Sequence, residues 1–73
     1  MKLTQDELRT HYEKGETVIL AHRKSYQIKW SKCVNAFTYS WEGMPRKITG
    51  LPFTKRGRYH VFTPEKAERI IYN

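Results

Sequence analysis

The sequence predicts a small α+β domain, in which a helix near each end of the chain flanks an antiparallel sheet of three to four strands with a long basic loop. Three observations indicate this fold: a helix-capping pattern near each end, two stretches that alternate apolar and polar residues, and a long stretch without any period. A chain of 73 residues is expected to form one small basic domain spanning residues 1–73.

The first helix is expected over residues 5–14. Thr4 and Glu7 have the spacing of a capping box, in which each side chain accepts a hydrogen bond from the backbone N–H of the other residue. Gly15 suits the left-handed position that ends many helices. The inner face of this helix is expected to carry Leu8, His11 and Tyr12.

Three strands are expected next. Residues 17–22 are rich in β-branched and apolar side chains, and residues 26–31 and 37–41 alternate with the strand period of two. A four-residue turn at 32–35 would set the register of the resulting hairpin. On one face it places Trp30 opposite Phe37, Ile28 opposite Tyr39 and Tyr26 opposite Trp41; on the other, Lys29 opposite Thr38 and Gln27 opposite Ser40.

The row of aromatic side chains on this hairpin is interpreted as the hydrophobic floor on which both helices pack, from one face of the sheet. Truncation of Trp30 or Trp41 would then remove about 3 to 5 kcal/mol from a total stability of about 7 kcal/mol. The alternative is that aromatic side chains of this row stack on unpaired bases, as on an RNA-recognition sheet. The candidates for such stacking are Tyr26, Trp30, Tyr39 and Trp41.

Residues 42–57 show no sustained period and contain three glycines and two prolines, which predicts a long loop with at most a brief strand at 47–49. A strand over 58–62 follows. The second helix is expected over 64–72, because Thr63 supplies an N-cap and is followed by proline at the first helical position. Its apolar stripe consists of Ala67, Ile70 and Ile71.

The net charge of +7 is concentrated in the middle of the chain. Residues 1–16 carry −1 and residues 65–73 carry zero, whereas residues 17–64 hold nine basic residues against one acidic residue. The same central stretch holds eight of the ten aromatic residues. Interleaved cations and aromatic rings are typical of surfaces that bind nucleic acid.

These patterns predict a non-enzymatic accessory protein that binds DNA or RNA through a basic and aromatic loop. The cations would contact phosphates, and no arrangement that reads bases is visible, so binding is expected to be sequence-tolerant and salt-dependent. Phe53 and Tyr59 are the aromatic residues best placed to stack beside these cations. The candidate nucleic-acid-binding residues are Arg23, Lys24, Arg46, Lys47, Lys55, Arg56, Arg58 and Tyr59.

Two alternatives share the same composition. One is a small phage-like inhibitor or adaptor that docks on an acidic surface of a host enzyme that handles nucleic acid, because Arg, Tyr and Trp are also preferred in protein interfaces. The other is a structural or ribosome-associated protein. Both a monomer and a homodimer are compatible with the sequence, since the strand at 17–22 is a candidate sheet edge for pairing with a second copy.

Other classes of function lack supporting motifs. The three histidines and Cys33 do not have the paired spacing of a metal site, and neither a phosphate-binding glycine loop nor a nucleophile with its base is visible, so no cofactor and no catalytic residue is expected. A single cysteine favours a reducing compartment. The longest apolar run, residues 18–21, is too short for a signal peptide or a membrane span, so a cytoplasmic location without membrane contact is expected.

The sequence Gly50-Leu51-Pro52-Phe53, followed by Arg58-Tyr59-His60-Val61-Phe62-Thr63-Pro64-Glu65 and Ile70, resembles the wing and following helix of small winged-helix proteins such as phage excisionases. The resemblance implies a basic wing that touches the DNA backbone, with Lys55, Arg56 and Arg58 as wing residues. Residues 25–42 occupy the place of that family's recognition helix, yet they alternate as strands do.

Overall fold

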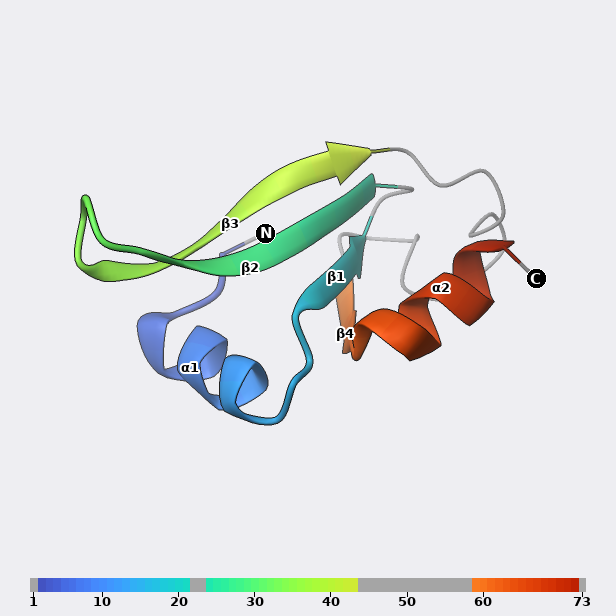
Figure 1. The fold of residues 1–73 in the computed structure, drawn as a ribbon, viewed down its shortest axis with the longest axis horizontal. Coiled ribbons are helices and arrows are strands. Elements are labelled where there is room, and N and C mark those ends of the chain that lie inside the picture. Colours follow the sequence, from blue (N-terminus) through green and yellow to red (C-terminus); the bar gives the residue numbers. More distant parts are fainter. Residues whose placement is uncertain (1, 22–23, 44–58, 73) are drawn as a thin grey trace.

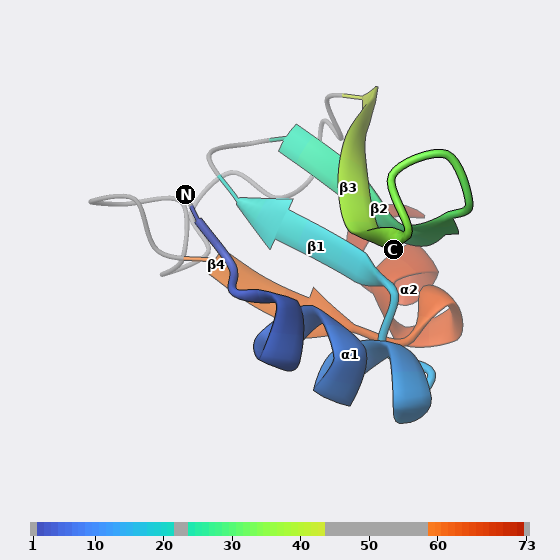
Figure 2. The ribbon, with the colours of Figure 1, turned by 90° about the vertical axis from the view of Figure 1, so that its left-hand side faces the viewer.

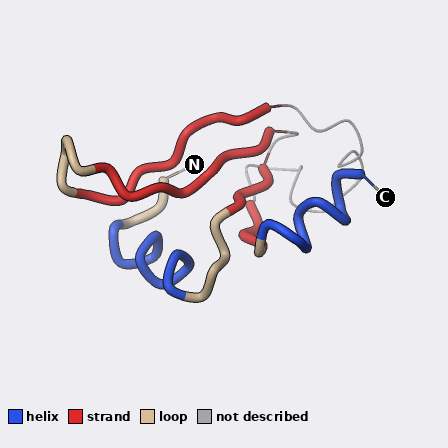
Figure 3. Tube along the Cα trace, viewed as in Figure 1, coloured by secondary structure: helices blue, strands red, loops and turns tan. Residues whose placement is uncertain are grey.

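A computed structural model of the chain describes residues 2–21, 24–43 and 59–72 (Figure 1). In chain order the elements are α1 (Gln5–Glu13), β1 (Val18–Ala21), β2 (Lys24–Ser31), β3 (Ala36–Gly43), β4 (Tyr59–Phe62) and α2 (Pro64–Tyr72). The four strands form one antiparallel sheet in the order β3-β2-β1-β4 (Figure 3). The predicted small α+β domain is confirmed. The brief strand expected at 47–49 lies outside the described residues, as does most of the expected long loop.

Local hydrogen bonds fix both ends of α1. The backbone N–H of Glu7 donates to the Thr4 hydroxyl at 3.2 Å, and the backbone N–H of Thr4 donates to the Glu7 carboxylate at 3.2 Å, which completes the expected capping box. At the other end Gly15 adopts a φ of +78°, a conformation that side chains disfavour. The N–H of Glu16 then reaches back to the carbonyl of His11 at 2.8 Å and closes the helix.

The hairpin of β2 and β3 has the register that the sequence predicts. Its turn at 32–35 contains Asn35 with a φ of +52°, a left-handed conformation that asparagine tolerates better than most residues. The observed cross-strand pairs include Trp30 with Phe37, Ile28 with Tyr39, Tyr26 with Trp41, Lys29 with Thr38, and Gln27 with Ser40.

The strand β1 lies in the interior of the sheet, between β2 and β4, and is not the edge that the sequence suggested. All four of its residues, Val18–Ala21, are buried. The run Val-Ile-Leu-Ala has no polar alternation, which is the pattern of a strand covered on both faces. Edge-to-edge pairing of β1 with a second copy is therefore excluded as long as this sheet is intact.

The two helices cover opposite faces of the sheet, and the prediction that both pack on one face is wrong. Val18 and Leu20 form a buried cluster with Ala67 of α2. Ile19, which points to the other face of β1, is buried in a separate cluster with Leu8 of α1 and with Ile28. Figures 1 and 2 show α1 and α2 on different sides of β1. One short strand therefore joins two small hydrophobic cores.

The two tryptophans are largely exposed, contrary to their expected place in the core. The side chain of Trp30 is 42% exposed and that of Trp41 is 59% exposed, whereas Ile28 between them is buried. The tryptophans are exposed because α1 is shorter than the hairpin on which it packs. The nine residues of α1 extend for about 13 Å, while each eight-residue strand of the hairpin extends for about 26 Å. The helix covers Ile28 and Phe37 and leaves Trp30 partly exposed and Trp41 largely exposed.

Candidate functional site

The described part of the protein is almost neutral. It contains eight lysines and arginines against all seven of the acidic residues, which leaves +1 of the total +7. The remaining six cations belong to residues 22–23 and 44–58, stretches that contain no acidic residue. Six of the eight candidate residues therefore lie outside the described residues: Arg23, Arg46, Lys47, Lys55, Arg56 and Arg58.

The described residues that flank these two basic stretches meet at one end of the sheet. Ala21, which precedes the first stretch, pairs with Lys24 on one side and with Tyr59 on the other. Gly43, which precedes the second stretch, pairs with Ser25. Neighbouring strands lie about 4.8 Å apart, so these flanking residues span only a few strand widths. We call this part of the sheet the basic end, defined by Ala21, Lys24, Gly43 and Tyr59 (Figure 1).

The structure brings two of the sequence-predicted site residues to the basic end, in different surroundings. Lys24 is exposed at the start of β2. Tyr59 is half-buried at the start of β4, and its ring packs against the cluster that contains Leu8 and Ile19. Its hydroxyl donates to Oε2 of Glu7 at 3.4 Å. Tyr59 thus holds β4 against α1 at the point where the second basic stretch ends.

The pKa values of Glu7 and Tyr59 are shifted in opposite directions, and the contact between the two side chains contributes to each shift. The hydrogen bond from the backbone N–H of Thr4, followed by that from the Thr4 hydroxyl, lowers the pKa of Glu7, and the Tyr59 hydroxyl adds to the effect. Burial, followed by the nearby charge of Glu7, raises the pKa of Tyr59. The ionised carboxylate and the protonated phenol are therefore the forms that stabilise the folded state.

The shifted pKa values of Glu7 and Tyr59 predict that the folded protein loses stability at both low and high pH. A lowered pKa for Glu7 means that its contribution is present above the unfolded value of about 4.3 and is lost as the pH falls further. A raised pKa for Tyr59 means that its contribution is lost as the pH rises above about 10. Thermal melting between pH 2 and 11 would measure both effects. The Tyr59→Phe variant should lose less stability between pH 9 and 11 than the parent, and an unchanged alkaline slope would contradict this assignment.

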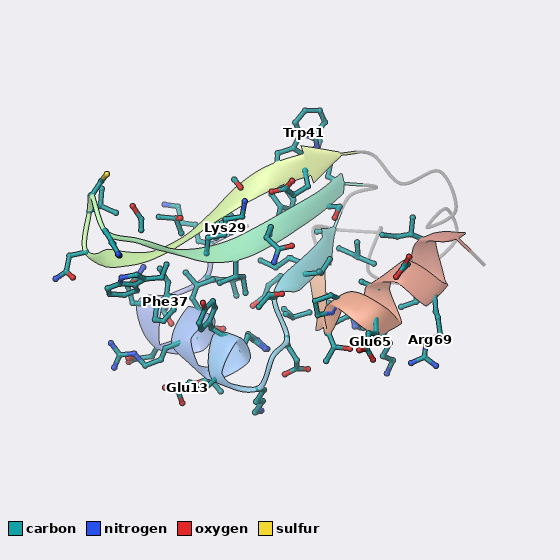
Figure 4. All side chains as sticks on the ribbon, in the orientation of Figure 1. Glu13, Lys29, Phe37, Trp41, Glu65 and Arg69 are labelled. Atoms are coloured by element: carbon teal, nitrogen blue, oxygen red, sulfur yellow. The ribbon has the colours of Figure 1, made fainter. Side chains whose placement is uncertain are left out.

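Trp41 is a candidate that the sequence placed in the core. It lies on β3, two residues before Gly43 and opposite Tyr26, and so belongs to the neighbourhood of the basic end. In Figure 4 the Phe37 ring points toward α1, whereas the Trp41 indole projects away from both helices. The twist of the hairpin carries this end of the aromatic row away from α1. The sequence offered one indication that Trp41 belongs to the site: it is the last aromatic residue before the basic stretch without a period.

On the polar face of the hairpin, the side chains of Lys29, Thr38 and Ser40 are exposed. Lys29 Nζ lies 3.6 Å from Oε1 of Glu42, and both side chains are exposed, so this ion pair contributes little to stability. Cys33 is exposed in the turn of the hairpin. Within residues 2–21, 24–43 and 59–72, no three His, Cys, Asp or Glu side chains gather as they would around a metal ion. No helix in these ranges is long and apolar enough to cross a membrane.

Comparison of the chain with protein-family models, with curated proteins and with solved structures finds no match. The structure itself bears on the winged-helix resemblance. Residues 24–43, in the place of that family's recognition helix, form the two long strands of the hairpin. The described strand β4 pairs with the interior strand β1 of the sheet.

Proposed function

We propose that this protein is a non-enzymatic nucleic-acid-binding accessory protein whose Lys and Arg side chains in residues 22–24 and 44–58 contact phosphates. One observation carries the proposal: the described framework is nearly neutral, and the uncompensated cations belong to two stretches whose flanking residues pair with one another at the basic end. A protein whose positive charge served solubility alone would have no need of this segregation.

The distribution of acidic residues supports the same proposal. Six of the seven acidic residues belong to the two helices or to Glu16 just beyond α1, and the seventh, Glu42, is paired with Lys29. Carboxylates repel phosphates, and the two that lie beside the basic end are already engaged: Glu42 faces Lys29 Nζ, and Glu7 accepts hydrogen bonds from Thr4 and Tyr59. Each phosphate contact releases a condensed counterion, and several such contacts make the affinity fall steeply as salt concentration rises.

The test replaces three cations of the second basic stretch together, in the variant Lys55→Gln, Arg56→Gln, Arg58→Gln. Fluorescence anisotropy with labelled single-stranded and duplex oligonucleotides, repeated between 50 and 300 mM salt, measures the affinity. We expect the variant to bind at least about tenfold more weakly at low salt. The slope of log K against log salt should become shallower by about 2 to 3, because about one counterion is released for each phosphate contact.

The matched control removes the same charge elsewhere, in the variant Arg9→Gln, Lys14→Gln, Lys32→Gln. These side chains are exposed on α1, just after it, and in the turn at the opposite end of the hairpin. This variant should retain the parent's salt slope. Equal losses in the two variants would show a non-specific charge effect. If the parent binds no oligonucleotide, the proposal fails, and a stoichiometric protein partner recovered from nuclease-treated lysate would then support the adaptor alternative.

A further inference from the structure

We infer that the ligand at the basic end is a single-stranded nucleic acid and that Trp41 stacks on one of its unpaired bases. The inference rests on the proposed function, which supplies the contacts to phosphates. It adds that the nucleic acid is single-stranded rather than duplex, and that Trp41 is the residue that distinguishes the two. The exposure of Trp41 supports this inference, because its indole is 59% exposed and the residue lies two positions before Gly43 of the basic end.

The other rings of the hairpin face are already engaged. The ring of Trp30 meets that of Phe37 edge to face, with centroids 4.9 Å apart, and Tyr12 covers another side of Phe37 at 5.1 Å. The rings of Tyr26 and Tyr39 meet edge to face at 5.9 Å. None of the ring contacts between described residues involves Trp41. Trp41 is therefore the most exposed ring of this row and the one without a ring contact among the described residues.

The immediate surroundings of Trp41 favour a charged ligand over an apolar one. Its chain neighbours Ser40 and Glu42 lie on the opposite face of β3, whereas Lys24 is exposed two residues along β2 from Tyr26, the cross-strand partner of Trp41. The half-buried rings of Tyr26 and Tyr39 beside Trp41 pack on each other, and no other large apolar side chain of the described residues is exposed at this end of the hairpin. A nucleic-acid strand offers a flat base for the indole and phosphates for the neighbouring cations.

The selectivity for single strands follows from the geometry of bases. In a duplex each base is stacked on both faces, so an indole at the protein surface finds no free π-face. In a single strand a base can turn outward, and stacking on one aromatic side chain strengthens binding by about five- to 150-fold. Stacking does not depend on base identity, which agrees with the sequence-tolerant binding of the proposed function.

The first test measures tryptophan fluorescence. Because the chain contains two tryptophans, replacing one of them leaves the other as a single reporter. In the Trp30→Phe variant Trp41 is the single tryptophan, and in Trp41→Phe it is Trp30. Titration with oligo(dT) and oligo(rU) should quench the emission of the first variant strongly and leave that of the second nearly unchanged. Quenching of Trp30 with none of Trp41 would overturn the inference.

The second test compares affinities. Trp41→Leu should bind oligo(dT) or oligo(rU) about five- to 150-fold more weakly than the parent, Trp41→Phe should recover most of the loss, and binding of duplex DNA should not change. Val34→Ser is the control, because Val34 is an exposed apolar residue in the turn at the opposite end of the hairpin.

The outcomes separate this inference from the proposed function. If Trp41→Leu binds single strands as well as the parent while binding remains salt-dependent, the stacking inference fails and the proposed function stands. If the parent binds duplex and single strands equally and Trp41→Leu weakens both alike, the preference for single strands fails. If the parent binds neither kind of strand, the proposed function fails as well. Matching thermal melts of all variants show that the differences arise from binding.

Discussion

Replacing either Ile19 or Leu20 with alanine is expected to remove about 2 to 5 kcal/mol from the free energy of unfolding. Both side chains are completely buried, although they are neighbours on a four-residue strand. Ile19 packs under α1 and Leu20 under α2, so each substitution opens a cavity in a different core. From a total of about 7 kcal/mol, either loss should lower the melting temperature by more than about 10 °C.

Thermal and urea denaturation of the two single variants would measure these losses, with the exposed residue Val34 replaced by alanine as the control. The control should differ from the parent by less than about 0.5 kcal/mol. A sheet covered by helices on one face would expose one of the two neighbouring residues on β1. A melting temperature that stays at the parent's value in either Ile19→Ala or Leu20→Ala would therefore contradict the two-core arrangement.

The features predicted correctly from the sequence are those that neighbouring residues determine. The capping box of Thr4 and Glu7 and the cap of α2 at Thr63 need only a few consecutive residues, and both form as expected. The register of the hairpin follows from the four-residue turn at 32–35 and from the alternation on either side of it. These elements are determined before any long-range packing is considered.

The side of the sheet on which each helix packs is a long-range property, and there the prediction was wrong. The run at 18–21 fits either an edge strand or a strand buried on both faces, and its four residues contain no alternation to distinguish them. The exposure of Trp41 has a similar origin. It depends on how far α1 reaches along the hairpin and on the twist of the sheet, neither of which is a property of the residues around Trp41.

The candidate site likewise has one feature that local sequence determines and one that depends on long-range packing. The segregation of charge could be derived by counting along the chain, because it is a property of the sequence. The pairing of the flanking residues at one end of the sheet could not, since it requires β1 to lie between β2 and β4. That strand order brings Lys24 and Tyr59 to either side of Ala21, although 34 positions separate them in the sequence.

Phe37→Ala is expected to loosen α1 selectively, at a cost of about 2 to 4 kcal/mol, somewhat below that of a fully buried phenylalanine. The half-buried ring of Phe37 lies between those of Tyr12 and Trp30. Its backbone is held by the side chain of Gln5: the N–H of Phe37 donates to Oε1 at 2.9 Å, and Nε2 donates to the carbonyl at 2.8 Å. The substitution removes the ring from this attachment and leaves α1 held by the two Gln5 hydrogen bonds and by the burial of Leu8 against Ile19 and Ile28.

Hydrogen exchange can distinguish selective loosening from a general loss of stability. In Phe37→Ala the amides of α1 should exchange faster relative to those of α2, because α2 packs on the separate cluster of Val18, Leu20 and Ala67. In Leu20→Ala the order should be reversed. The variant Phe37→Leu, which keeps most of the apolar contact, should lie close to the parent in both measurements. If Phe37→Ala accelerated exchange equally in both helices, the two cores would unfold as one cooperative unit, because β1 would transmit the loss of one core to the other.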